Sequence, residues 1–116
     1  MPLIKVQTSL ADTAALDVEG LLKSLSADLA RHLGKSESYV MTAFESGVPM
    51  TFAGTAEPTC FVEIKSVGTM GAKTKTMSAS FCQHLSDALE IPAERIYIEF
   101  ADTKGAMWGW NGQTFG

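Results

Sequence analysis

The stretch VEGLLKSLSADLARHLG, residues 18–34, decides the fold because its apolar residues recur at three- and four-residue spacing. Such a stripe is typical of an amphipathic helix that buries one face. Asp17 is placed to cap the first turn, and Gly34 suits the left-handed residue just past the last turn. The stripe consists of Val18, Leu21, Leu22, Leu25, Leu29 and Leu33.

Strands are predicted on both sides of this helix. Residues 3–10 alternate in polarity, and Ile4, Val6 and Thr8 are predicted to face the core. Residues 39–45 alternate again, after a short turn at 35–38. Glycine and proline interrupt residues 46–58, which predicts a connection with a short extended piece around 50–53.

The second half of the chain repeats this plan. A strand from Cys60, closed by Gly68, precedes a helix that Pro92 is expected to stop. Residues 95–101 alternate as a strand, and Trp108, Trp110 and Phe115 lie in a glycine-rich tail. In this last strand, the inward residues are predicted to be Ile96, Ile98 and Phe100, and the outward ones Arg95, Tyr97 and Glu99.

The two halves align at an offset of about 56 residues, which indicates an internal duplication. We expect one domain over residues 1–116, with pseudo-repeats at about 1–46 and 58–102. Because βαβ crossovers are right-handed, two such units predict an α/β fold of the α+β sandwich type. It has a four-stranded mixed sheet with both helices on one face. The other face is left uncovered, so self-association is a hypothesis. The residues expected there are Lys5, Gln7, Met41, Glu63, Lys65, Tyr97 and Glu99.

The charge and residue composition exclude several classes of binding partner. The net charge is −4 and no basic cluster is present, so neither nucleic acid nor a membrane is expected as a partner. Cys60 and Cys82 are predicted to be buried thiols in a reducing compartment. His32 and His84 lack the companions of a metal site and are predicted to be solvent-exposed helix residues, so no metal or cofactor is expected. The start of the chain does not resemble a signal peptide, which predicts a cytoplasmic protein and leaves export without a leader open.

Pro2 opens the first strand and raises a chemical possibility. If the initiator methionine is trimmed, the chain begins with a secondary amine, and an α-amino group has a pKa of about 7.7–8.0. Desolvation or a nearby cation lowers that pKa and yields a base at neutral pH. A proline that merely starts an edge strand is the simpler interpretation of this end alone.

Several short motifs, in this order on a duplicated plan, carry a resemblance over the full length. The motifs are Met1-Pro2, Gly34-Lys35 with Tyr39, Ala53-Gly54, Glu57-Pro58, Ser66-Val67-Gly68, Arg95-Ile96-Tyr97-Ile98, and Gly109-Trp110-Asn111 with Thr114-Phe115. On these motifs the chain resembles the macrophage migration inhibitory factor family of the tautomerase superfamily, whose mature chains begin with a catalytic proline.

The resemblance implies a homotrimer around a central channel, with an active site at each subunit boundary. It implies keto-enol tautomerisation of small 2-oxo acids of the phenylpyruvate type, without a cofactor. Pro2 would act as general base and acid, and Lys35 would bind the substrate carboxylate and keep the Pro2 pKa low. Val67 would offer its backbone N–H, and Tyr97 of a neighbouring subunit would offer a hydroxyl or an aromatic wall.

The chain departs from the family pattern at three places. Glu99 stands where better-known animal relatives have asparagine, and a carboxylate there affects which anionic substrates are accepted. Thr59 and Val62 replace the Cys-x-x-Cys motif of some relatives, so thiol oxidoreductase activity is not expected. Residues 104–108, which shape the pocket mouth in relatives, also differ.

Two other functions remain open at this stage. The protein could be a cytokine-like signalling or binding protein that uses the surface of the trimer. Alternatively, the same Pro2 site could serve a hydratase, dehalogenase or decarboxylase, with Glu99 orienting a water.

Overall fold

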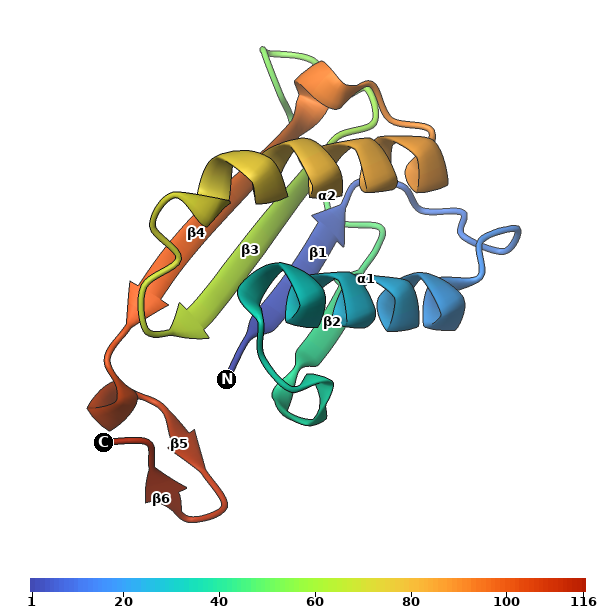
Figure 1. Ribbon diagram of the computed structural model, residues 1–116. Coiled ribbons are helices and arrows are strands. Elements are labelled where there is room, and N and C mark those ends of the chain that lie inside the picture. The colour runs from blue at the N-terminus through green and yellow to red at the C-terminus, as the bar shows by residue number, and fades with distance from the viewer.

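The computed structural model describes residues 1–116, and it shows one four-stranded sheet covered on one face by two helices (Figure 1). The strand order is β2-β1-β3-β4. β1 runs parallel to β2 and antiparallel to β3, and β3 runs parallel to β4. The predicted mixed sheet with both helices on one side is therefore confirmed. The main elements are β1 (Leu3–Thr8), α1 (Val18–Leu33), β2 (Met41–Glu45), β3 (Cys60–Val67), α2 (Lys73–Leu89) and β4 (Ile96–Thr103).

The core lies between the helices and the sheet, as the alternation predicts. Ile4, Val6 and Thr8 of β1 are fully buried, and so are Leu25 and Leu29 of α1. From α2, the contributing side chains are Met77, Phe81, Leu85 and Leu89. Burying one such side chain stabilises the fold by roughly 1.5–3 kcal/mol, so these stripes hold the two layers together.

The ends of α1 follow the predicted signals. The Asp17 carboxylate accepts a hydrogen bond from the backbone N–H of Gly20 at 2.9 Å. Gly34 has a φ of 65°, in the left-handed region that favours glycine. Lys35 follows directly, so the end of α1 fixes where this lysine leaves the helix.

Three details differ from the sequence predictions. β1 ends at Thr8 rather than at Leu10. Tyr39 belongs to a short 3-10 helix, η1 (Glu37–Tyr39), and β2 begins only at Met41. The extended piece in the connection is reduced to a single bridge between Phe52 and Thr55. The end of α2 at Leu89, before Pro92, agrees with the prediction.

Arg95 is the clearest correction, because it is buried rather than outward-facing. It lies in the 3-10 helix η2 (Ala93–Arg95), and β4 starts one residue later. Its guanidinium group donates to the backbone carbonyls of four residues in the 46–58 connection and lies 5.3 Å from the centre of the Phe52 ring. The four acceptors are Phe52, Thr55, Glu57 and Pro58.

The two histidines are also corrected, because they lie partly buried between the helices. His32 of α1 contacts Ser80 at 3.2 Å and packs against the Phe81 ring. His84 of α2 contacts Asp28 at 3.1 Å. The helical period shows which residues lie outside the apolar stripe of a helix. It does not show which of these residues contact a second helix.

The tail folds back as a small hairpin beyond the end of β4, formed by β5 (Gly109–Trp110) and β6 (Gln113–Thr114) (Figure 1). Asn111 and Gly112 form its turn, and both have positive φ, the pattern of a tight Asn-Gly hairpin. The 3-10 helix η3 (Gly105–Met107) links β4 to this hairpin. None of the helices combines the length and the apolar character needed to cross a membrane.

Candidate active site

Pro2 lies immediately before β1 and is fully buried. Its carbonyl accepts a hydrogen bond from the backbone N–H of Met41 at 3.0 Å, which ties it to β2. On the other side, Leu3 pairs with Lys65 of β3, so Pro2 lies at the level of Ser66. The start of β1 is therefore held between two neighbouring strands.

Lys35 reaches this same place from the end of α1. Its ammonium group donates to the hydroxyl of Ser66 at 2.9 Å and to the carbonyl of Val67. It has no carboxylate partner. The sequence pointed to Lys35 and Val67 but not to Ser66, although Ser66 stands in the quoted Ser-Val-Gly motif and is itself buried.

The terminal amine responds to this environment. In the chain that begins with Met1, burial lowers the pKa of the terminal amine below its ordinary value of 8.0, and the nearby Lys35 charge lowers it further. Both causes penalise the ammonium form, so the amine at this position loses its proton at a lower pH than usual. The position therefore suits a base.

Val67 extends past the end of β1, because the β1–β3 pairing stops at Leu3 and Lys65. The end of β3 is thus open on the side of Pro2. The residues after Val67 line the largest hollow of the molecule, about 670 Å³, together with the end of β4 and η3. Its lining consists of Val67, Gly68, Thr69, Asp102, Thr103, Lys104, Gly105 and Met107.

Tyr97 and Glu99 are not brought to Pro2 within one chain. Ala101 of β4 pairs with Lys65, at the level of Leu3, whereas Tyr97 pairs with Phe61. Tyr97 therefore lies four residues, or roughly 13 Å, further along the strand. It is 65% exposed on the uncovered face and packs against the Phe52 ring at 4.9 Å.

Glu99 lies on the same uncovered face, beside Glu63 of β3. Glu63 pairs in turn with Lys5 of β1, so the row across the sheet holds two carboxylates and one ammonium group. The side chain of Lys65 also approaches Glu63, at 3.8 Å. The predicted set of residues on this face is confirmed by the register of the four strands.

An aromatic cluster that sequence reasoning missed lies at the Pro2 end. The Tyr39 ring packs against Trp110 at 5.4 Å and against Phe115 at 6.3 Å, and the latter two rings stack. Tyr39 stands two residues before Met41, whose N–H binds the Pro2 carbonyl. The tail aromatics were recognised in the sequence, but no pattern indicated that Tyr39 would be their partner.

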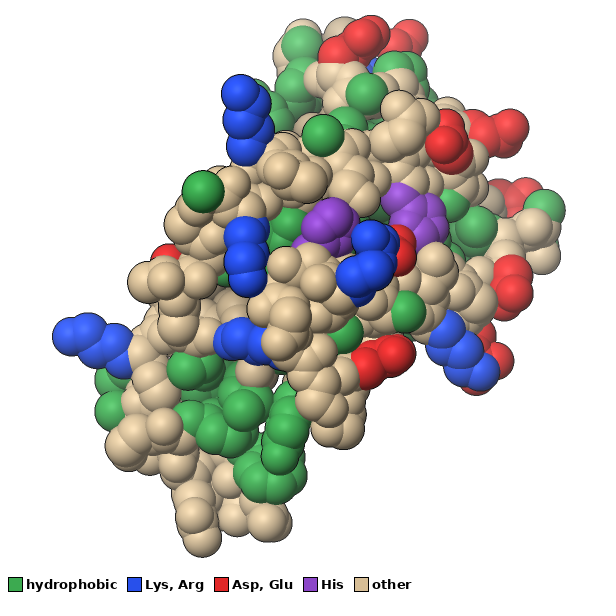
Figure 2. Space-filling view, in the orientation of Figure 1, with side chains coloured by type: hydrophobic (Ala, Val, Ile, Leu, Met, Phe, Trp, Pro, Cys, Tyr) green, Lys and Arg blue, Asp and Glu red, His purple; other side chains and the backbone are tan.

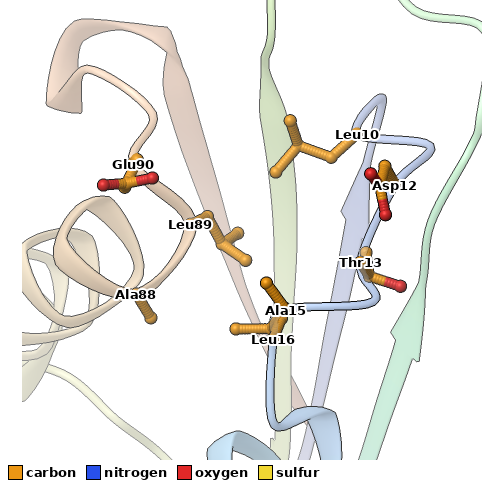
Figure 3. A pocket seen from close by; sticks show the side chains of 8 residues that line it. All are labelled: Leu10, Asp12, Thr13, Ala15, Leu16, Ala88, Leu89 and Glu90. Carbon is orange, nitrogen blue, oxygen red and sulfur yellow. The ribbon is translucent and has the colours of Figure 1, made fainter.

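A second pocket, of about 210 Å³, lies where the β1–α1 connection meets the end of α2 (Figure 3). Leu10, Leu16 and Leu89 form much of its wall, and its charged side chains are Asp12 and Glu90. It holds none of the candidate residues. No group of three or more His, Cys, Asp or Glu side chains converges anywhere in the structure.

Comparison with known proteins matches the whole chain to one family. The family model described as macrophage migration inhibitory factor (MIF) matches residues 1–116. The chain is 39% identical to a macrophage migration inhibitory factor homolog of Trichuris trichiura, covering 99% of this chain and 100% of the relative. It is 35% identical to macrophage migration inhibitory factor of Rattus norvegicus, covering 99% of both chains.

Solved structures agree with this match. The structure of a macrophage migration inhibitory factor homologue from Prochlorococcus marinus superposes with a TM-score of 0.92 at 51% identity, covering 98% of this chain and 99% of the other. Leishmania major MIF2 superposes with a TM-score of 0.85 at 33% identity, covering 99% of this chain and 97% of the other. The chain therefore belongs to the macrophage migration inhibitory factor family.

Proposed function

We propose that the protein is a keto-enol tautomerase for 2-oxo acids of the phenylpyruvate type, with Pro2 as its general base and acid. The family includes members with tautomerase activity. The observation that carries the proposal is the convergence of Lys35 on Ser66 and Val67 beside the start of β1.

The base is the amine of Pro2 in the chain that has lost Met1. Removing a proton next to a ketone needs a base whose pKa lies near the ambient pH. Burial and the Lys35 charge lower the pKa of a terminal amine at this end of the chain. The Pro2 nitrogen takes the proton from the carbon beside the ketone, and the resulting ammonium returns it to the ketone oxygen to give the enol. The reverse sequence converts the enol to the ketone.

Lys35 positions the substrate. An ammonium group has three donors, and Ser66 and Val67 occupy two of them. The third donor is left for the substrate carboxylate, and no acidic side chain competes for the charge. Fixing the carboxylate in this way holds the carbon on the far side of the ketone near the Pro2 nitrogen, which lowers the entropic part of the barrier.

The proposal also includes a homotrimer with sites at the subunit boundaries. Tyr97 lies too far from Pro2 to serve the same site within one chain, and it is exposed on the uncovered sheet face. A second copy that packs against this face could present Tyr97, and with it Glu99, to the Pro2 of the first copy. The family is typically trimeric.

The direct test measures ketonisation of enol phenylpyruvate by ultraviolet absorbance, on a sample whose intact mass shows that it begins at Pro2. Pro2→Gly is expected to lower kcat/KM by about a hundredfold or more, the contribution of a positioned general base. Pro49→Gly is the control, because it changes an exposed proline in the 46–58 connection. Equal rates for the wild type and Pro2→Gly would refute the proposal.

A mixing experiment tests the shared site. Pro2→Gly and Tyr97→Ala chains are each expected to lose activity as pure samples. When the two chains are unfolded and refolded together, some boundaries combine an intact Pro2 with an intact Tyr97, so activity returns. If the mixture stays as inactive as its components, Tyr97 does not serve the Pro2 of a neighbour.

A further inference from the structure

The hollow beside Val67 carries an inference about the substrate, and this inference rests on the proposed function. The hollow shares Val67 with the candidate site, because Val67 lines it and the Val67 carbonyl accepts from Lys35; from there it continues to the end of β4 and η3. A ligand held by Lys35 through its carboxylate can therefore extend past Val67 into this space. With about 670 Å³, the hollow has room for a substituted aryl group.

Lys104 is the one cation in the lining of this hollow. It precedes η3, its side chain is exposed, and it makes no ion pair or side-chain hydrogen bond. Asp102 is the only carboxylate in the lining, and one of its oxygens accepts the backbone N–H of Met70 at 2.9 Å. Lys104 thus has no acidic partner within the protein.

The distribution of charged side chains on the face shown in Figure 2 points the same way. In Figure 2, Lys and Arg side chains dominate the left of the view, while Asp and Glu gather toward the top and right. The pocket at the far end of the sheet contains Asp12 and Glu90 and no cation. A chain with a net charge of −4 therefore keeps unpaired lysines on both sides of Val67. Such a local field attracts anions in spite of the net charge.

We propose that Lys104 forms a second anion-binding position, and that the preferred substrate is a 2-oxo acid with a second acidic group at its far end. Lys35 holds the carboxylate next to the ketone, and Lys104 holds the distal anion across the hollow. The two lysines then select for the length of the substrate as well as for its charge.

The test compares phenylpyruvate with phenylpyruvate that carries a carboxylate at the para position of the ring. Lys104→Gln is expected to raise KM for the ring-carboxylated substrate by about three- to fivefold, the range of an exposed ion pair. KM for phenylpyruvate and kcat for both are expected to stay unchanged. Lys104→Arg is expected to retain the wild-type KM, and Lys75→Gln serves as the control for lost charge because Lys75 is exposed and outside the hollow.

A binding experiment keeps this inference separate from the proposed function. Titration calorimetry with 3-(4-carboxyphenyl)propanoate and 3-phenylpropanoate needs no turnover. The dianion is expected to bind the wild type more tightly, with a preference that Lys104→Gln removes and that weakens as salt is added. If phenylpyruvate is turned over but Lys104→Gln affects both ligands equally or neither, the second anion position is wrong and the tautomerase proposal stands. If nothing is turned over but the preference for the dianion depends on Lys104, the second anion position stands and the tautomerase proposal is wrong.

Discussion

Replacing Arg95 by methionine should loosen the 46–58 connection without disturbing the core. Methionine keeps an apolar stem of similar length but has no donors. In the native protein, the guanidinium group donates to Pro58 and Glu57 at 2.9 Å, to Phe52 at 3.1 Å and to Thr55 at 3.5 Å. The variant leaves all four carbonyls without this partner.

The size of the effect follows from these contacts. A hydrogen bond to a charged group is worth about 1.5–3 kcal/mol when its loss leaves a buried partner unpaired. Thr55, Glu57 and Pro58 are exposed, so water can replace the guanidinium at their carbonyls. We therefore assign about 1 kcal/mol to each of the three short bonds and about 0.5 kcal/mol to the contact with the Phe52 ring. The free energy of unfolding should fall by about 3–4 kcal/mol.

Thermal and urea denaturation at one fixed protein concentration measure this loss, since self-association would shift Tm with concentration. For a chain of this length, 1 kcal/mol corresponds to about 4 °C, so Tm should fall by about 12–16 °C. Arg31→Met is the matched control, because Arg31 is 66% exposed and pairs only with Asp28 on the surface. That control should lose less than about 1 kcal/mol.

Arg95→Lys separates charge from geometry. An ammonium group can satisfy only some of the four carbonyls. The decrease in the free energy of unfolding of Arg95→Lys should therefore lie between those of Arg31→Met and Arg95→Met. Because Phe52 packs against Tyr97, Arg95→Met should also raise KM in the tautomerase assay. If Arg95→Met is no less stable than Arg31→Met, the connection is held by other contacts and this reasoning fails.

Three further predictions concern the terminal amine, the thiols and the helix cap. Lys35→Met should move the midpoint of the pH dependence of kcat/KM upward, because burial and the Lys35 charge both lower the pKa of a terminal amine at this end of the chain and the variant removes the second cause; an unchanged or lower midpoint would contradict this cause. Cys60, whose burial raises its pKa to about 12, should resist iodoacetamide in the folded protein and react only on unfolding, whereas Cys82 should react first, as mass spectrometry of digested samples can show. Asp17→Ala should lower the free energy of unfolding by about 1 kcal/mol and Tm by about 4 °C, while Asp17→Asn should lose less than half of that, since the lost partner is the Gly20 N–H.

The layers of the fold could be predicted from the sequence because their periods are strong. Leu25 and Leu29 mark a helical stripe, Ile4 and Val6 a strand face, and all four are fully buried. The duplication then left few ways to connect the elements. Register follows from the same alternation, since a slip by one residue would bring Lys5 into the core.

Arg95 could not be predicted because its partners are backbone carbonyls. Every residue has a backbone carbonyl, so the sequence does not show which carbonyls bind an arginine. Arg95 also has no acidic partner whose position in the sequence would indicate its burial. The alternation of β4 was extended one residue too far, into η2, where the chain direction differs. The partial burial of His32 and His84 could not be predicted for a related reason. Their contacts depend on how the two helices pack and not on either helix alone.

At the candidate site, the sequence indicated the residue types but not their distances. Lys35 and Val67 were each expected to bind the substrate, and in the structure the Lys35 ammonium group donates to the Val67 carbonyl. Ser66 was missed because a buried serine in a strand looks like any core position of small size. The separation of Tyr97 from Pro2 is decided by the pairing of β3 with β4, which the residues themselves do not reveal.

The burial of Pro2 also limits the time during which Met1 can be removed as the chain is synthesised. β1 is an interior strand, and it can pair only after residues 41–67 have been synthesised. At ribosomal rates of about 5–20 residues per second, the first residues stay extended and accessible for several seconds. Once the sheet closes, Pro2 is buried and its carbonyl is bound by the backbone N–H of Met41 at the start of β2. If the Pro2 amine is the base, we expect the aminopeptidase that frees it to act on the nascent chain, before Pro2 is buried, and a chain that folds first to keep its methionine.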